Sequence, residues 1–240
     1  MNMTYKTKFF LNSKYLLCLT VFYAVFCLSA DVVAFRFTGF GPVVESGATL
    51  LFPLTYLISD IVAEVYGYNV AKMLIWLILI GEVIFALLLR LVMLTPTAPF
   101  FHDDQAFGLV INPMLRFVIS GVVANVASDF MNIYIISKWK ILAKGRLFWL
   151  RSIVSTAISE LVLILIVVIL AFSSTLDVKS LMQVLVSAYG LELVYAFIFV
   201  WPGWALSSFL KRAENLDVFD YNINYNPFKF AGLHKEINND

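Results

Sequence analysis

The chain has 240 residues, of which 61% are hydrophobic and only 14% are charged. A soluble domain has about 45–50% apolar and about 25% charged residues, so this composition excludes an ordinary soluble protein. The formal net charge of +1 gives no sign of a nucleic-acid-binding surface.

The apolar residues fall in six long segments, and a helix needs roughly 20 such residues to cross a bilayer. The segments lie at about 15–34, 48–66, 70–94, 107–137, 147–173 and 180–209. They are too long for strands and lack period-two alternation. We therefore predict an all-α polytopic membrane protein, with six transmembrane helices in residues 1–212 and a polar tail in residues 213–240.

Lysine and arginine gather on one side of these predicted spans, which is typical of the cytoplasmic face. That side has Lys14, Lys72, Lys138, Lys140, Lys144, Arg146, Arg151, Lys211 and Arg212. The opposite side has Arg36, Lys179 and the acidic pair Asp103 and Asp104. Both termini are therefore predicted to be cytoplasmic, and the Asn-rich tail is expected to be partly disordered.

The second segment has ionisable and aromatic residues at every fourth position: Phe52, Tyr56, Asp60 and Glu64. This spacing puts them on one helix face, where they could stack against a flat ring and accept hydrogen bonds from its N–H edge. The alternative is that Glu64 is interfacial and that Asp60 pairs with a cation for packing alone.

The fourth segment has a polar stripe formed by Asn125, Ser128, Asp129 and Asn132. Such a stripe serves either helix packing or a polar cavity. Arg116 lies further toward the outer side of the same segment. It either neutralises Asp60 or Asp129, or extends to the outer surface.

Two further acids lie in the last segments. Glu160 follows several Ser and Thr residues in the fifth, and Glu192 precedes Pro202 in the sixth. Ionisable residues at membrane depth are costly and face the bundle interior. Because these carboxylates outnumber the interior cations, we predict a polar cavity between segments two, four, five and six. Segments one and three are interpreted as mainly lipid-facing scaffold.

Several catalytic signatures are absent from the sequence. There is no phosphate-binding G-x-x-x-x-G-K-[ST] loop and no H-E-x-x-H motif. The only histidines are His102 and His234, and the only cysteines are Cys18 and Cys27, which face nearly opposite sides of a helix. We therefore expect no enzyme, no cofactor and no metal centre, and transport of a solute is favoured.

Residues 52–67 read FPLTYLISDIVAEVYG. This run resembles the signature F-P-x-x-Y-x-x-x-D-x-x-x-E-x-Y-G of the queuosine precursor transporter family, which was earlier grouped with vitamin uptake transporters. Residues 132–140 are similar to the end of that family's fourth helix, and residues 148–156 to the start of its fifth. The resemblance covers roughly residues 15–212.

The resemblance implies a six-helix carrier in the bacterial inner membrane, with a fold like the substrate-binding subunits of vitamin importers but without an ATPase. Its substrates would be 7-deazapurines such as 7-cyano-7-deazaguanine, 7-aminomethyl-7-deazaguanine or queuine. The expected partners are this small molecule and the lipid bilayer, without nucleic acid. Whether the chain forms a homo-oligomer is left open. The candidate contacts are Phe52, Tyr56, Asp60, Glu64, Arg116, Asn125, Asp129, Asn132, Glu160 and Glu192.

The chain departs from the family pattern at three positions. It has Asn132 and Leu163 where many members have Asp, and Glu192 where many have Lys. These differences leave the exact deazapurine open. Two other functions also stay open: a substrate-binding subunit that needs a separate energising partner, and a membrane enzyme or scaffold.

Overall fold

The computed structural model describes residues 13–229, apart from residue 42 and residues 174–175. Its α-helices are α2 (Lys14–Val33), α3 (Phe52–Tyr66), α4 (Tyr68–Val92), α5 (Asp104–Leu142), α6 (Phe148–Val167) and α7 (Val178–Glu214). A hairpin of β1 (Phe37–Phe40) and β2 (Val43–Ser46), followed by a 3-10 turn (Gly47–Leu50), connects α2 to α3. A π-helical turn (Val168–Phe172) extends α6.

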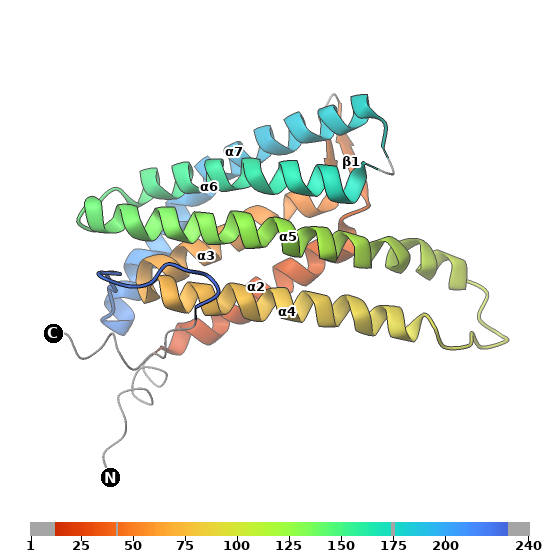
Figure 1. Ribbon diagram of the computed structural model, residues 1–240, viewed down its shortest axis with the longest axis horizontal. Helices are drawn as coiled ribbons and strands as arrows, with labels where there is room; N and C mark the ends of the chain where they lie inside the picture. The colour runs from red at the N-terminus through yellow and green to blue at the C-terminus, as the bar shows by residue number, and fades with distance from the viewer. Residues whose placement is uncertain (1–12, 42, 174–175, 230–240) are drawn as a thin grey trace, which may run out of the picture.

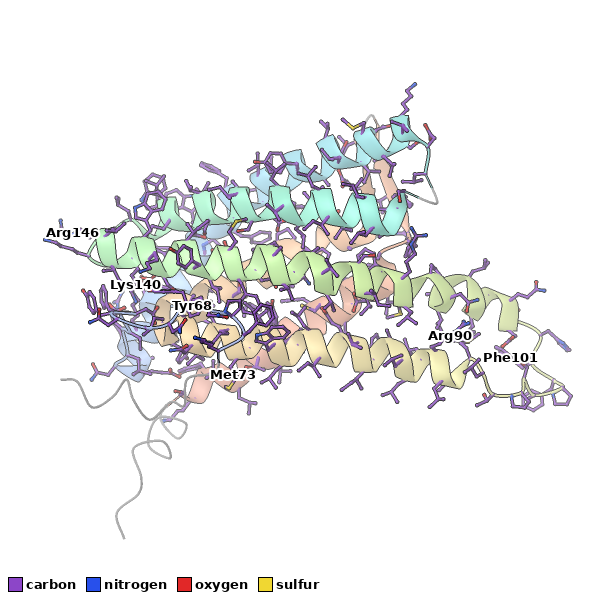
Figure 2. The ribbon with its side chains drawn as sticks, in the orientation of Figure 1. Tyr68, Met73, Arg90, Phe101, Lys140 and Arg146 are labelled. Atoms are coloured by element: carbon purple, nitrogen blue, oxygen red, sulfur yellow. The ribbon has the colours of Figure 1, made fainter. Side chains whose placement is uncertain are left out.

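The helices lie roughly parallel to the long axis of the molecule, which is horizontal in Figure 1, and successive helices run in opposite directions. The start of α2 and the end of α7 lie at one end, and the hairpin and the α4–α5 connection lie at the other. Figure 2 places Lys140 and Arg146 at the first end, which we call the basic end, and Arg90 and Phe101 at the opposite end. The charge asymmetry of the sequence is therefore also an asymmetry of the bundle.

Five of the helices are long and apolar enough to cross a membrane: α2, α4, α5, α7, and α6 together with its π-helical turn. Large apolar side chains on their outer faces, such as Leu17, Leu88 and Phe197, are more than half exposed. Such surfaces suit contact with lipid chains. The prediction of an all-α polytopic membrane protein is confirmed.

The segment predicted as a span at 48–66 differs from the other five. Its α-helix, α3, has only 15 residues, and 12 of them are buried. Pro53 lies in the first turn of α3, and Gly67, with a φ of 85°, ends the helix. The helix contacts α2, α4, α5 and α7. It is therefore an inner helix enclosed by the longer ones.

The connection between α2 and α3 has more structure than the sequence indicated. β1 pairs antiparallel with β2, with Phe37 opposite Ser46, although we expected no strands. Ser46 Oγ donates a hydrogen bond to the Ala34 carbonyl and accepts one from the Ala48 amide. The hairpin is thereby fixed to the end of α2 and to the turn that leads into α3.

Residues 215–229 of the tail lie against the basic end of α4 and α5. The Tyr68 amide donates to both carboxylate oxygens of Asp220, at 3.1 and 3.0 Å, and Trp76 Nε1 donates to the Pro227 carbonyl at 2.9 Å. Lys72 Nζ donates to the Lys229 carbonyl at 2.8 Å. The carbonyls of Pro227 and Lys229 accept hydrogen bonds from side chains of α4, so this part of the tail is docked on the bundle. Residues 230–240 lie outside the described part, so the expectation of a partly disordered tail stays a prediction.

Gly67 is the position where a side chain would disrupt the docked tail. A Cβ atom there would lie 2.8 Å from Val218 Cγ1 and 2.9 Å from Asp220 Oδ1, and the φ of 85° is strained for other residues. We predict that Gly67→Ala lowers the free energy of unfolding by about 1–3 kcal/mol, measured by unfolding in detergent. Gly81→Ala in α4 is the control, because nothing lies within 4 Å of its Cβ; equal losses in both variants would contradict the prediction.

Candidate functional site

Asp60 lies at the centre of a hydrogen-bonded group formed by three helices. Asn132 Nδ2 on α5 donates to Asp60 Oδ1 at 2.6 Å, and Ser152 Oγ on α6 donates to Asp60 Oδ2. The side chain of Asp60 is only 1% exposed. The two donors fix the orientation of the carboxylate without supplying a cation.

A cavity lies beside this group, between α3, α6 and α7. It is lined by Pro53, Tyr56, Leu57, Asp60, Ser152, Thr156, Glu192, Ala196, Phe199 and Val200. The volume of this cavity is about 20 Å³. This volume has room for little more than a water molecule, so a ring-sized solute requires the walls of the cavity to move apart.

Several buried acceptors around the cavity have no hydrogen-bond donor among the described residues. They are Asn132 Oδ1, Glu192 Oε2 and both carboxylate oxygens of Glu160. An unsatisfied buried polar group costs about 1–3 kcal/mol, and more when it is charged. These groups are therefore suited to receive donors from a ligand or to hold protons.

Asp129 belongs to a second polar group, deeper in the bundle. Its carboxylate lies against the hydroxyls of Tyr56 on α3 and Tyr23 on α2, and within electrostatic reach of Glu160. Tyr56 also lines the cavity. This tyrosine therefore connects the cavity with the second polar group.

Glu64 is placed differently from Asp60, although both lie on one face of α3. Arg151 donates to Glu64 Oε2 and Oε1 at 2.9 and 3.2 Å, and Lys211 Nζ donates to Oε1 at 2.6 Å. Lys140 Nζ donates to the Glu64 carbonyl at 2.6 Å. Arg151 and Lys211 bind the carboxylate of Glu64, so this residue joins α3 to α6 and α7, and its carbonyl joins α3 to α5. Glu64 does not line the cavity.

Of the ten candidate contacts only Tyr56, Asp60 and Glu192 line the cavity. Asn132, Asp129 and Glu160 lie behind this lining, and three further candidates lie elsewhere in the bundle. Phe52 packs into an apolar cluster near the hairpin end, and Asn125 is buried on α5. Arg116 Nε and one terminal nitrogen donate to the Leu170 carbonyl at 3.2 and 2.9 Å. Arg116 lies 13 residues before Asp129 on α5, about 20 Å along the helix at a rise of 1.5 Å per residue. It therefore does not neutralise Asp129.

The sequence interpretation missed three buried acids that lie away from the basic end. Asp31 on α2, Glu82 on α4 and Glu45 on β2 are at most 5% exposed. Asp31 and Glu82 lie in segments interpreted as mainly lipid-facing scaffold, so these segments also contribute acids to the bundle interior. A single acid within a long apolar run was the available signal, because such an acid must face the bundle interior.

A family model described as "putative vitamin uptake transporter" matches residues 46–205, which are 160 of the 240 residues. The chain belongs to this family. It is therefore a polytopic transport protein for a small molecule and not an enzyme. The matched region includes α3 and all the residues that line the cavity. Searches of curated proteins and of solved structures give no significant match.

The ion pair between Glu64 and Arg151 gives a prediction about stability. Glu64→Gln leaves two cations without their carboxylate, and removing one partner of a buried pair costs about 3–5 kcal/mol. We expect a corresponding loss in the free energy of unfolding, measured in detergent. The double variant Glu64→Gln/Arg151→Gln should lose less than the sum of the two single variants. Strict additivity would contradict the coupling.

Glu45 gives a prediction about pH. Burial raises the pKa of Glu45 to about 7, and the nearby Thr49 side chain opposes the rise. The pKa in the unfolded chain is about 4.3, so the folded state binds more protons between these values. The contribution of Glu45 to the free energy of unfolding should be fully present below about pH 4 and should be lost as the pH rises to about 7. Glu45→Gln should remove this part of the decline in pH-dependent unfolding, and an unchanged slope would disprove the assignment.

Proposed function

We propose that this chain imports queuosine precursors, which are 7-deazapurines such as 7-cyano-7-deazaguanine, 7-aminomethyl-7-deazaguanine or queuine. The observation that supports this proposal is the chemistry of the cavity. It has an oriented carboxylate, Asp60, an aromatic ring, Tyr56, and a buried acceptor without a donor on Glu192. The sequence resemblance in residues 52–67 points to the same substrates.

The match between this cavity and a deazaguanine is one of donors to acceptors. The ring offers adjacent N–H donors on one edge, and a carboxylate accepts two such donors at once. Its flat face suits Tyr56 and Phe199 as stacking partners. A purine analogue without these donors would leave buried acceptors unpaired, and sites of this kind reject such analogues strongly.

We also propose that the basic end faces the cytoplasm of a bacterium and that the protein lies in the inner membrane. Lys14, Lys144, Arg146, Lys211 and Arg212 lie at the ends of helices that meet there. Positively charged residues of this kind favour the cytoplasmic side. Solute then crosses from the hairpin end to the basic end as α7 separates from α3 and α6.

Uptake in a bacterial strain that cannot make the precursor tests this function. The wild type should accumulate labelled 7-cyano-7-deazaguanine and restore queuosine in tRNA. Asp60→Asn replaces one acceptor by a donor, so uptake should fall about tenfold to a hundredfold, as expected for one mismatched buried hydrogen bond. The control is Asp103→Asn, since Asp103 is exposed before α5.

Two results would contradict the proposal. Failure of the wild type to restore queuosine with any 7-deazapurine would exclude the substrate class. Equal uptake by the wild type and by Asp60→Asn, at matched protein levels, would exclude the cavity as the binding site. Ligand-dependent thermal stabilisation against nucleobases and vitamins then identifies the alternative substrate, because a bound ligand raises the unfolding temperature.

A further inference from the structure

A line of buried acids runs through the bundle beside the cavity. Asp31 on α2, Glu82 on α4, Asp129 on α5 and Glu160 on α6 are 5%, 4%, 7% and 0% exposed. Glu82 is an electrostatic neighbour of both Asp31 and Asp129, and Glu160 is a neighbour of Asp129. We call these four residues the acid line. Only Asp129 and Glu160 of the four belong to the candidate substrate contacts.

The acid line extends from the hairpin end to the middle of the bundle. Asp31 lies 17 residues after the start of α2 and Glu82 lies 14 residues after the start of α4. At 1.5 Å per residue these positions are about 25 Å and about 21 Å from the basic end. Asp129, 13 residues before the end of α5, is about 20 Å from it. Asp31 is therefore nearest the hairpin end, and Glu82 and Asp129 lie at mid-depth.

The side chains that face Glu82 from the surrounding helices are acids, tyrosines and a thiol. α2 contributes Tyr23, Cys27 and Asp31, and α5 contributes Asp129. The titratable groups of α3 are Tyr56, beside Asp129, and Asp60, Glu64 and Tyr66, which lie nearer the basic end. The Cys27 thiol is also an electrostatic neighbour of Glu82.

The nearby cations are bound elsewhere. Arg90 on α4 donates to Asn112, Arg116 donates to the Leu170 carbonyl, and Lys72 donates to the Lys229 carbonyl. Lys140, Arg151 and Lys211 surround Glu64. No lysine or arginine of the described residues is an electrostatic neighbour of Glu82 or Glu160.

Ionised carboxylates cannot all persist in such surroundings. Moving an unpaired carboxylate out of water costs several kcal/mol, and neighbouring negative charges add to that cost. Asp31 Oδ2 and both oxygens of Glu160 are buried and have no donor among the described residues. The ligand that satisfies a carboxylate here without a counter-ion is a proton. In the described part of the chain, no group of three or more His, Cys, Asp and Glu side chains could hold a metal ion.

We infer that the acid line is a proton path that couples substrate import to proton influx. The inference rests on the proposed transport function. A proton bound at Asp31 passes by way of Glu82 to Asp129. Tyr56 lies against Asp129 and also lines the cavity. Through Tyr56, binding of a proton at Asp129 affects binding of substrate in the cavity. One proton bound from the hairpin side leaves the cavity on the basic side with each uncharged substrate molecule, so protons balance and one positive charge enters in each cycle.

The test uses the full chain in proteoliposomes with 7-cyano-7-deazaguanine, which is uncharged. Exchange of labelled for unlabelled substrate is measured without a gradient. Accumulation is then measured with an alkaline interior, and a trapped pH dye reports proton influx. The wild type should accumulate substrate above equilibrium and acidify the interior when substrate is added. Glu82→Gln should keep exchange within about twofold, because Glu82 does not line the cavity, but should lose accumulation at least tenfold together with the dye signal.

Glu214→Gln is the matched control, because Glu214 is a buried acid that accepts from the Tyr15 amide at the basic end. It should accumulate substrate like the wild type. Exchange without gradient-driven accumulation in the wild type would overturn the coupling alone. Full accumulation by Glu82→Gln would overturn the acid line. Loss of exchange in both Glu82→Gln and Asp31→Asn would assign these residues to substrate movement. That result would overturn the inference of a proton path separate from the cavity. Absence of exchange in the wild type would overturn the proposed function, and the coupling with it.

Discussion

Glu64 and Arg151 form an ion pair in a part of the bundle where both side chains are almost completely buried. Arg151 also donates to the carbonyls of Arg146 and Ile136, so it joins α3 to α6 and to the end of α5. Lys211 adds α7. A buried pair is stable only when hydrogen bonds satisfy its remaining donors and acceptors, and this one meets that condition. Four helices are thereby fixed at one end, while their other ends surround the polar interior.

The shortness of α3 follows from the same arrangement. A helix that contacts lipid must cover the hydrocarbon thickness with apolar side chains. α3 is surrounded by other helices, so it needs neither the length nor the apolar surface of a span. It can therefore have Asp60 and Glu64 one turn apart. Glu64 lies at the level of the cations, whereas Asp60 lies one turn deeper, where only neutral donors reach it. Depth in the bundle thus gives two similar acids different roles.

The main helices could be predicted from the sequence because apolar runs and basic flanks report directly on span length and orientation. α2 and α4 begin and end within two residues of the predicted ranges. The docked tail and the hairpin could not be predicted, because their stability comes from single long-range contacts such as Tyr68 with Asp220. In the site, residue spacing placed Tyr56 and Asp60 on one helix face. The spacing did not indicate that Arg151, which we had assigned only to the basic flank, forms an ion pair with Glu64.

The cavity is narrow but holds unsatisfied polar groups. Its walls are nearly in contact, yet Glu192 in the lining and Asn132 and Glu160 behind it have acceptors without donors among the described residues. Such a closed state without ligand is destabilised by each unsatisfied group. Donors supplied by a solute or protons supplied by water relieve this penalty, and a ligand shifts an equilibrium only through such a difference between two states. The same unsatisfied acceptors therefore favour both substrate and proton as ligands of the closed bundle, which is the condition that coupling between them requires.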